Sequence, residues 1–341
     1  MSSDVKNITE KTAKSSIDPI YDTNWCDMPA EIKSVCIGKM KFKERLSLRC
    51  TAKAERSLVH IQKIEFDDGR FWGYNKKLLV KLYSDDKRDF LKEVDKNYAF
   101  ELLNYIKNVG VFKNLFFYVG NSFADYKQFT SDCGLFTAKK IEFELCNFEE
   151  VVAVLRKMEN GVESIKMNYC RIVSDELAGI LKISHVQNAS YWHIKDYNKT
   201  DSLHMVAQMW TDENSKVGSN LQVSSLGDGS FGEFLEHFDD HIVSKSEKRV
   251  RIRTNNPDCH ILLERGLDEI VQIDDSPQFF RLQVISAEML ESEYDDDCRE
   301  WICKMNPYIY DSDDSSEQSD DVSDFEDNDD ILHVYDSDDN D

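Results

Sequence analysis

The sequence contains neither a long apolar run nor an apolar leader. No stretch of its 341 residues approaches the roughly 18–20 consecutive apolar residues that a membrane-spanning helix needs. The first twenty residues also lack the apolar segment of a secretory signal. We therefore expect no membrane partner and a location in the cytoplasm, the nucleus or both.

A disulfide pattern is absent as well, although Cys298 and Cys303 lie close together in the sequence. The chain has nine cysteines, an odd number, and no CxxC motif. A complete disulfide framework needs an even number, and disulfides are rare in reducing compartments. We expect most of these cysteines to be small buried apolar residues.

The common signatures of catalysis are missing. There is no phosphate-binding loop, no GxSxG and no HExxH. The glycines of LGDGSFG (Gly227, Gly229 and Gly232) fit a turn before a helix better than a nucleotide loop. His237 and His241 lie four apart, a spacing that can place two metal ligands on one helix face, but no third ligand is evident nearby. We predict no catalytic residue, no cofactor and no metal site.

Positive charge is scarce, and the negative charge is unevenly placed. The net charge is −23, yet residues 311–341 alone hold fifteen Asp or Glu and no Lys or Arg. The rest of the chain is therefore only mildly acidic, at −8. It has no broad positive surface of the kind that neutralises nucleic-acid phosphates, so we expect no nucleic-acid partner.

Both ends of the chain read as disordered. Residues 307–341 are too charged and too poor in apolar residues to fold alone, and residues 1–24 are polar throughout. Ser323 has an acidic residue three positions later, which makes it a candidate site for an acid-directed kinase. The acidic tail either recruits a basic partner, competes with a target, or only keeps the protein soluble.

Residues 25 to about 60 have the pattern of a small helical unit. Asp27 can cap a first helix and Pro29 suits its first turn. Two further helical patterns follow, over 42–50 and 52–59. Apolar residues recur at helical spacing in the first helix, at Ile32, Val35, Cys36 and Met40. So small a unit has little core of its own, and we expect it to depend on a partner for stability.

From about 61 to 306, strand-like and helix-like segments alternate. We predict strands at 115–119, 140–145, 164–169, 191–197 and 221–225, and helices at 148–158, 174–182, 200–210 and 232–238. The strands start about 24 to 30 residues apart, a period typical of a leucine-rich-repeat-like arc. A doubly wound sheet would give a similar alternation. After 238 the chain is strand-rich, in RVRIRT, HILLE, EIVQI and FFRLQVI.

The helical unit resembles an F-box. The segment WCDMPAEIKSVCIGKMKFKERLSLRCTAKAERSLV (25–59) contains the Met28-Pro29 pair, an acidic-aliphatic pair at Glu31 and Ile32, and the run RLSLR. The remainder resembles the FTH domain of nematode F-box proteins in the runs AKKIEFEL, YWHIKDY, MVAQMWTDENSKVGSNLQV and GEFLEHF. The resemblance implies a mixed α+β or α/β fold: a three-helix F-box over 25–68 and a leucine-rich-repeat-like, FTH-like substrate-binding domain over 69–306.

A function follows from this resemblance. An F-box protein is the non-catalytic substrate-recognition subunit of a Skp-cullin-F-box ubiquitin ligase, which binds a Skp-type adaptor and, through it, a cullin. The residues expected to meet the adaptor are Met28, Pro29, Ile32, Leu46 and Leu48. The alternative for these side chains is that they form only the core of the helical unit. Many F-boxes carry a tryptophan in the third helix, where this chain has Glu55-Arg56.

Two features are candidates for target binding. The run KSEKRVRIR places Arg249, Arg251 and Arg253 on one side of a strand, either as a solvated face or as a patch that binds an acidic segment. The aromatic residues Tyr191, Trp192, Tyr197 and Trp210 are either core or binding anchors. Besides the ligase subunit, two hypotheses stay open: a non-ligase binding scaffold, and an enzyme whose site the sequence does not reveal.

Overall fold

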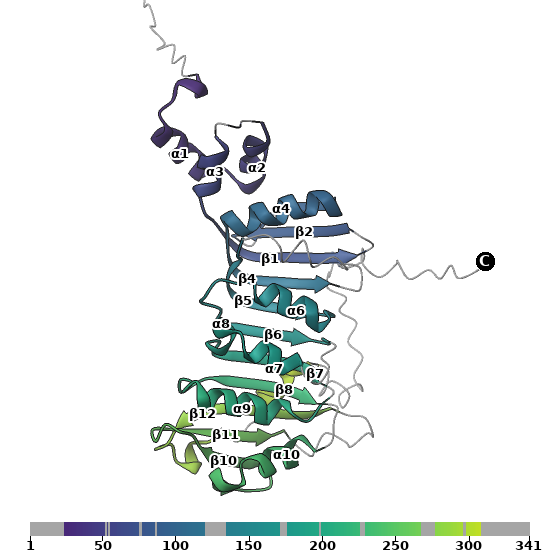
Figure 1. Ribbon diagram of the computed structural model, residues 1–341, viewed down its shortest axis with the longest axis vertical. Helices are drawn as coiled ribbons and strands as arrows, with labels where there is room; N and C mark the ends of the chain where they lie inside the picture. Colours follow the sequence, from purple (N-terminus) through teal and green to yellow (C-terminus); the bar gives the residue numbers. More distant parts are fainter. Residues whose placement is uncertain are drawn as a thin grey trace, which may run out of the picture. The chain divides into compact units, whose positions relative to one another are not determined.

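The computed structural model describes residues 24–51, 53, 55–74, 77–85, 87–119, 134–170, 176–197, 199–225, 229–266, 277–295 and 298–307 (Figure 1). Residues 1–23 of the predicted leader lie outside this set, as do residues 308–341 of the acidic tail, with Ser323. The strand predicted at EIVQI (269–273) also lies outside it. None of the helices in the described ranges has the length and apolar character required to cross a membrane.

The chain has a mixed α/β fold and divides into two compact units. Unit 1 comprises residues up to 142 together with 149–162, and unit 2 comprises 143–148 together with 163 onward. Helices and a mixed sheet occur in both. Each unit is described by itself.

Unit 1 begins with the predicted helices. After a short 3-10 turn, η1 (Trp25–Asp27), come α1 (Ala30–Lys39), α2 (Phe42–Thr51) and α3 (Arg56–Ile61). Asp27 is not the cap of α1, because it belongs to the preceding turn, in which the Asn24 side chain accepts a hydrogen bond from the Cys26 amide at 3.2 Å. Pro29 takes the cap position instead. It has no amide hydrogen to leave unsatisfied there.

The unit 1 sheet has the strand order β3-β2-β1-β4-β5. Its elements are β1 (Ile64–Tyr74), β2 (Lys77–Ser84), β3 (Lys87–Asp95), α4 (Lys96–Val109), β4 (Gly110–Val119), β5 (Thr137–Glu144) and the following α6 (Phe148–Leu155). The strands β1, β2 and β3 form an antiparallel meander, and α4 then leads to β4, which pairs in parallel with β1. Gly69 of β1 allows this close packing, because a Cβ there would lie 2.4 Å from the ring of Phe112.

The helical unit shares its core with this sheet. Phe42, the first residue of α2, is fully buried against aromatic side chains of β1, β3 and α4. Its ring centroid lies 5.8 Å from that of Phe66, 4.9 Å from Phe90 and 5.5 Å from Tyr105. The sequence pattern led us to expect that these helices need a partner for stability. The sheet of the same unit supplies the core that the helices lack.

Unit 2 continues the alternation of strands and helices. Its elements are β6 (Ser164–Asn168), α7 (Glu176–Leu181), α8 (Ser184–Gln187), β7 (Tyr191–Tyr197), α9 (Ser202–Asp212), β8 (Asn220–Ser225), α10 (Ser230–His237), η2 (Asp239–His241), β9 (Ile242–Lys245), β10 (Arg249–Arg253), β11 (Cys259–Arg265), β12 (Gln278–Ser286), η3 (Glu291–Glu293) and α11 (Arg299–Met305). The strands follow the order β6-β7-β8-β12-β11-β10-β9, in which β6, β7 and β8 are parallel and the others antiparallel.

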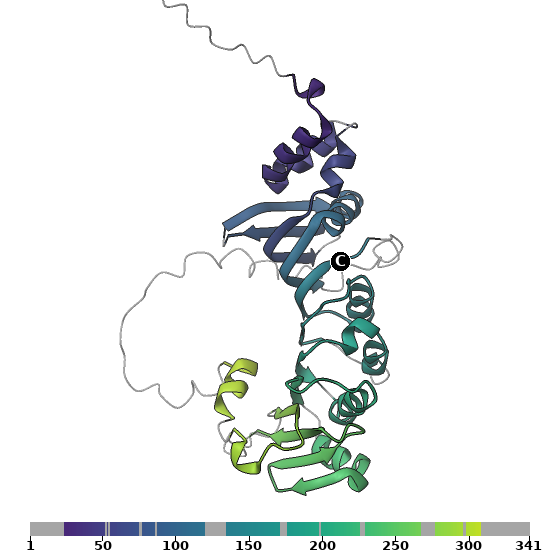
Figure 2. The ribbon, with the colours of Figure 1, turned by 90° about the vertical axis from the view of Figure 1, so that its left-hand side faces the viewer.

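The two faces of the unit 2 sheet differ. One face is apolar and buried, through Ile165, Trp192 and Leu221 among others. Figure 2 shows the helices on one side of this sheet and the segment after β12, coloured yellow, on the other. On that second side Phe279 of β12 packs with Trp301, Ile302 and Met305 of α11. We call this second side of the unit 2 sheet, which carries α11, the inner face.

Candidate functional site

An exposed apolar face on α1 coincides with part of the predicted adaptor site. The side chain of Ile32 is 50% exposed and that of Val35 is 60% exposed, whereas Ile37 of the same helix is completely buried. Met28 is half-buried and Pro29 is exposed at the start of the helix. Ile32 and Val35 are three residues apart and share one side of α1, and Met28 and Pro29 directly precede the helix. We call these residues (Met28, Pro29, Ile32 and Val35) the α1 face.

An ion pair connects α1 to the start of α3. The Nζ of Lys33 lies 3.0 Å from the Oε1 of Glu55, and both side chains are largely buried. The hydrogen bond from the Lys33 ammonium holds the pKa of Glu55 below its usual value. Lys33 also lies over the ring of Trp25, 5.9 Å from its centroid. Lys33 thus links α1 both to the residue before α3 and to η1.

Arg45 of α2 ties together the ends of the other two helices. Its guanidinium donates to the carbonyl of Met40 at 3.0 Å, of Gly38 at 3.0 Å and of Gln62 at 3.2 Å. Carbonyls at helix ends lack intrahelical donors, and the Arg45 side chain donates hydrogen bonds to several of these carbonyls. Burial lowers the pKa of Arg45.

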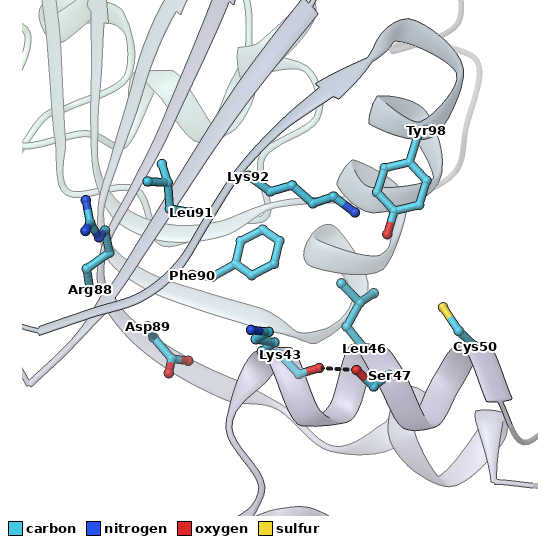
Figure 3. A pocket seen from close by; sticks show the side chains of 10 residues that line it. All are labelled: Lys43, Leu46, Ser47, Cys50, Arg88, Asp89, Phe90, Leu91, Lys92 and Tyr98. Atoms are coloured by element: carbon cyan, nitrogen blue, oxygen red, sulfur yellow. Dashed lines mark hydrogen bonds between the residues drawn. The ribbon is translucent and has the colours of Figure 1, made fainter. Parts of the chain in front are cut away.

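The structure places Leu46 away from solvent, unlike the α1 face. Leu46 is buried and lines a pocket of about 610 Å³ between α2, β3 and α4. Figure 3 shows Leu46, Phe90 and Tyr98 along this pocket, with the Lys92 side chain extending toward the Tyr98 ring, whose centroid lies 4.2 Å from its Nζ. Leu48 is half-buried. Of the five predicted adaptor residues, Met28, Pro29 and Ile32 lie at the start of α1, and Leu46 packs against β3 and α4.

The three arginines of β10 do not form one open basic surface. Arg251 is buried, although its alternation with Val250 and Ile252 is as predicted. Arg249 donates to Glu264 at 3.0 Å and to the Asp295 carbonyl at 2.7 Å. Among the three, only Arg253 is exposed. The segment that follows β12 covers this side of the strand, which local alternation could not reveal.

The two histidines of HFDDH are not on one helix. His237 is the last residue of α10, and His241 lies in η2. The His237 ring stacks on that of His204, with centroids 4.8 Å apart, and the Nδ1 of His204 is 3.4 Å from Glu233. Within the described ranges, no group of three or more His, Cys, Asp or Glu side chains is placed to hold a metal ion.

A polar cluster on the inner face was not predicted. In the parallel register of β6, β7 and β8, Lys166 lies beside His193, and His193 lies beside Gln222. The hydroxyl of Tyr191 donates to the Oε1 of Gln222 at 2.9 Å. Burial, together with the charges of Lys166 and Lys195, lowers the pKa of His193 to about 4. The sequence signal was the even spacing of polar residues within each strand, but the register between strands was needed to bring them together.

Comparison with protein-family models gives no match, and comparison with curated proteins and with solved structures gives none either. The function is therefore inferred from the geometry of the chain itself.

Proposed function

We propose that this chain is the substrate-recognition subunit of a Skp-cullin-F-box ubiquitin ligase, without catalytic activity of its own. Residues 25–68 would act as the F-box that binds a Skp-type adaptor, which connects to a cullin. Residues 69–306 would be the FTH-like, leucine-rich-repeat-like domain that binds the target protein. The complex would work in the cytoplasm, the nucleus or both.

The α1 face is the observation that carries this proposal. The core of the helical unit is already filled by Ile37, Phe42 and Val59, all with no exposed surface. Ile32 and Val35 are therefore not needed for that core, and they remain half or more exposed. Large apolar side chains left exposed one turn apart on a helix are typical of a protein contact site.

The adaptor contact we propose consists of Met28, Pro29 and Ile32, extended by Val35. Leu48 is half-buried and can contribute through its exposed part. Leu46 would act only by holding α2 against β3 and α4, because its side chain is buried there.

The target would be bound by unit 2. Its parallel strands carry helices on one face, as in repeat proteins that use the opposite strand face for binding (Figure 2). Trp192, Tyr197 and Trp210 are buried, so they serve the core. Tyr191 is only partly buried and points to the inner face, which makes it the candidate anchor of this aromatic group.

Co-purification with a Skp-type adaptor tests the proposal. The native chain, an Ile32→Asp variant and an Ile61→Asp control are each co-expressed with the adaptor. Ile61 is 72% exposed at the end of α3, outside the α1 face, so the control adds the same charge to the same helical unit. A charge buried in the adaptor contact costs about 3 kcal/mol, or roughly 100-fold in affinity.

We expect the native chain and Ile61→Asp to co-purify with the adaptor and Ile32→Asp to be lost, with equal circular dichroism for all three. Equal binding by the two variants would remove the α1 face from the contact. No complex with the native chain would favour the non-ligase scaffold, which binds through unit 2 and the acidic tail.

A further inference from the structure

The inner face of β6 and β7 presents cations and aromatic rings together. Residues of the same parity in neighbouring parallel strands point to the same side of a sheet. Lys166 of β6 pairs with His193 of β7, and Asn168 pairs with Lys195. The Nζ of Lys195 lies 4.7 Å from the centroid of the Tyr169 ring, just after β6.

These two lysines lack the acidic partner that Arg249 and Arg281 of the inner face have in Glu264. On β12, Arg281 lies 2.6 Å from Glu264 of β11, and on β10, Arg249 lies 3.0 Å from the same carboxylate. Neither Lys166 nor Lys195, both half-buried, makes an ion pair with any carboxylate of the described residues. The histidine between them is largely buried, and its pKa is lowered to about 4, so it adds no positive charge at neutral pH. Two half-buried ammonium groups without a carboxylate partner are available for charge-assisted hydrogen bonds to an anion.

The last described helix lies on this face, and an anionic segment follows it in the sequence. The last described helix, α11, packs there through Trp301, which lies against Arg281 of β12 with 5.5 Å from the guanidinium to the ring centroid. The same helix contacts β8, the strand next to β7. The description ends at 307, and residues 311–341 hold fifteen Asp or Glu and no Lys or Arg.

The tether is short enough for the tail to reach the lysines. Neighbouring strands lie about 4.8 Å apart, so β7 and β6 are roughly 5 and 10 Å beyond β8. An extended chain spans about 3.3 Å per residue, and ten residues therefore suffice. A short tether gives the tail an effective concentration on the order of millimolar at the lysines, which compensates for the weakness of each exposed ion pair.

We propose that Lys166 and Lys195, with Tyr169 and Tyr191, form a carboxylate-binding surface on the inner face, and that the acidic region 311–341 of the same chain occupies it. The binding of the tail does not depend on the proposed function, but its effect on target choice does. A target bound by the inner face would have to displace the tail, so the receptor would favour targets with an acidic segment.

Zero-length carbodiimide cross-linking of the full chain tests this. The reagent joins a carboxylate only to an amine that touches it, and mass spectrometry of the monomer identifies the joined residues. Lys182, exposed at the end of α7 on the helix side of the sheet, is the matched control. Cross-links are compared at about 50 mM and 500 mM NaCl, because the screening length falls from roughly 14 Å to 4 Å between them.

We expect cross-links from Lys166 and Lys195 to residues 311–341 at low salt, at least five times more frequent than from Lys182 and lost at high salt. Equal cross-linking of Lys182, or cross-links confined to covalent dimers, would overturn the proposal. The experiment contains no adaptor. A negative result here therefore leaves the adaptor contact standing, and failure to bind the adaptor leaves the carboxylate-binding surface standing.

Discussion

The guanidinium of Arg251 lies 3.0 Å from the hydroxyl of Tyr294, on the side of β10 that the chain covers after leaving β12. The same side chain donates to the carbonyls of Met289 at 2.7 Å and Ala287 at 2.8 Å. One buried cation thus holds the segment from the end of β12 to η3 against the sheet. Hydrogen bonds from a charged donor are stronger than neutral ones, so this anchor is expected to matter for stability.

Replacing Arg251 with Met should lower the free energy of unfolding by about 3 kcal/mol, because the carbonyls it serves would remain buried without a donor. Arg253→Met, on the same strand but exposed, should change it by less than about 0.5 kcal/mol. Urea denaturation of both variants measures the difference. Similar losses for the two would mean that Arg251 does not anchor the segment.

Arg251 also shows where sequence reasoning stops. The alternation in RVRIR correctly predicts a strand, with Val250 and Ile252 in the core. It cannot tell which distant segment covers the arginine side, because that depends on the pairing of β10 with β11 and of β11 with β12. The same limit hid the proximity of Lys166 and Lys195, which local patterns place only within their own strands.

Strand positions in the regular part of the chain were predictable for a physical reason. The predicted strands at 164–169, 191–197 and 221–225 correspond to β6, β7 and β8, because each has apolar residues at every second position. Strand β3 gave a weaker signal. It lies at the edge of the unit 1 sheet and buries only Phe90 and Val94, so its sequence KRDFLKEVD looks polar.

Periodicity likewise identified the apolar residues of the first helices but not their partners. Ile32 and Leu46 both lie in apolar helical patterns, yet Ile32 is exposed and Leu46 is buried against the sheet. The difference in burial depends on β3 and α4, which lie beside Leu46. Both elements follow later in the chain, so the helical pattern alone carries no information about them.

The stability of the protein should fall in mild acid because of His193. Its pKa is about 4 in the folded chain, below the 6.5 of an unfolded histidine, so the unfolded state takes up a proton first. The stability contribution is complete above pH 6.5 and is lost as the pH falls toward 4. Between pH 7 and pH 5 we expect a loss of about 2 kcal/mol.

A His193→Gln variant should remove this part of the acid sensitivity, whatever its effect at pH 7. The exposed His241→Gln is the matched control and should keep the native difference between the two pH values. Urea denaturation at pH 7 and pH 5 gives both differences. If His193→Gln loses as much stability as the native chain between these values, the buried neutral histidine is not the cause.

Two glycines at the start of α10 should respond in opposite ways to alanine. Gly232 lies inside the helix, and a Cβ there would have no neighbour within 4 Å. Gly232→Ala should therefore stabilise the protein by about 0.5–1 kcal/mol through better helix propensity. Gly229 precedes the helix with φ of 101°, where a side chain is strained, so Gly229→Ala should destabilise it by about 1 kcal/mol. Thermal unfolding of the two variants should shift in opposite directions.

The α1 face should depend on Arg45, which does not itself belong to it. Arg45→Met would leave the carbonyls of Gly38, Met40 and Gln62 without their donor, at a cost of about 1–3 kcal/mol. These carbonyls lie at the ends of α1 and α3, so the loss should open the helical unit locally while the unit 1 sheet stays folded.

Hydrogen exchange should then accelerate about tenfold or more in α1 and α3 and remain unchanged in β1 and β4. Lys43→Met, an exposed change at the second residue of the same helix, should leave exchange in all four elements as in the native chain. Equal acceleration in the strands would instead mean that the helices and the sheet unfold as one, as their shared Phe42 contacts would then require.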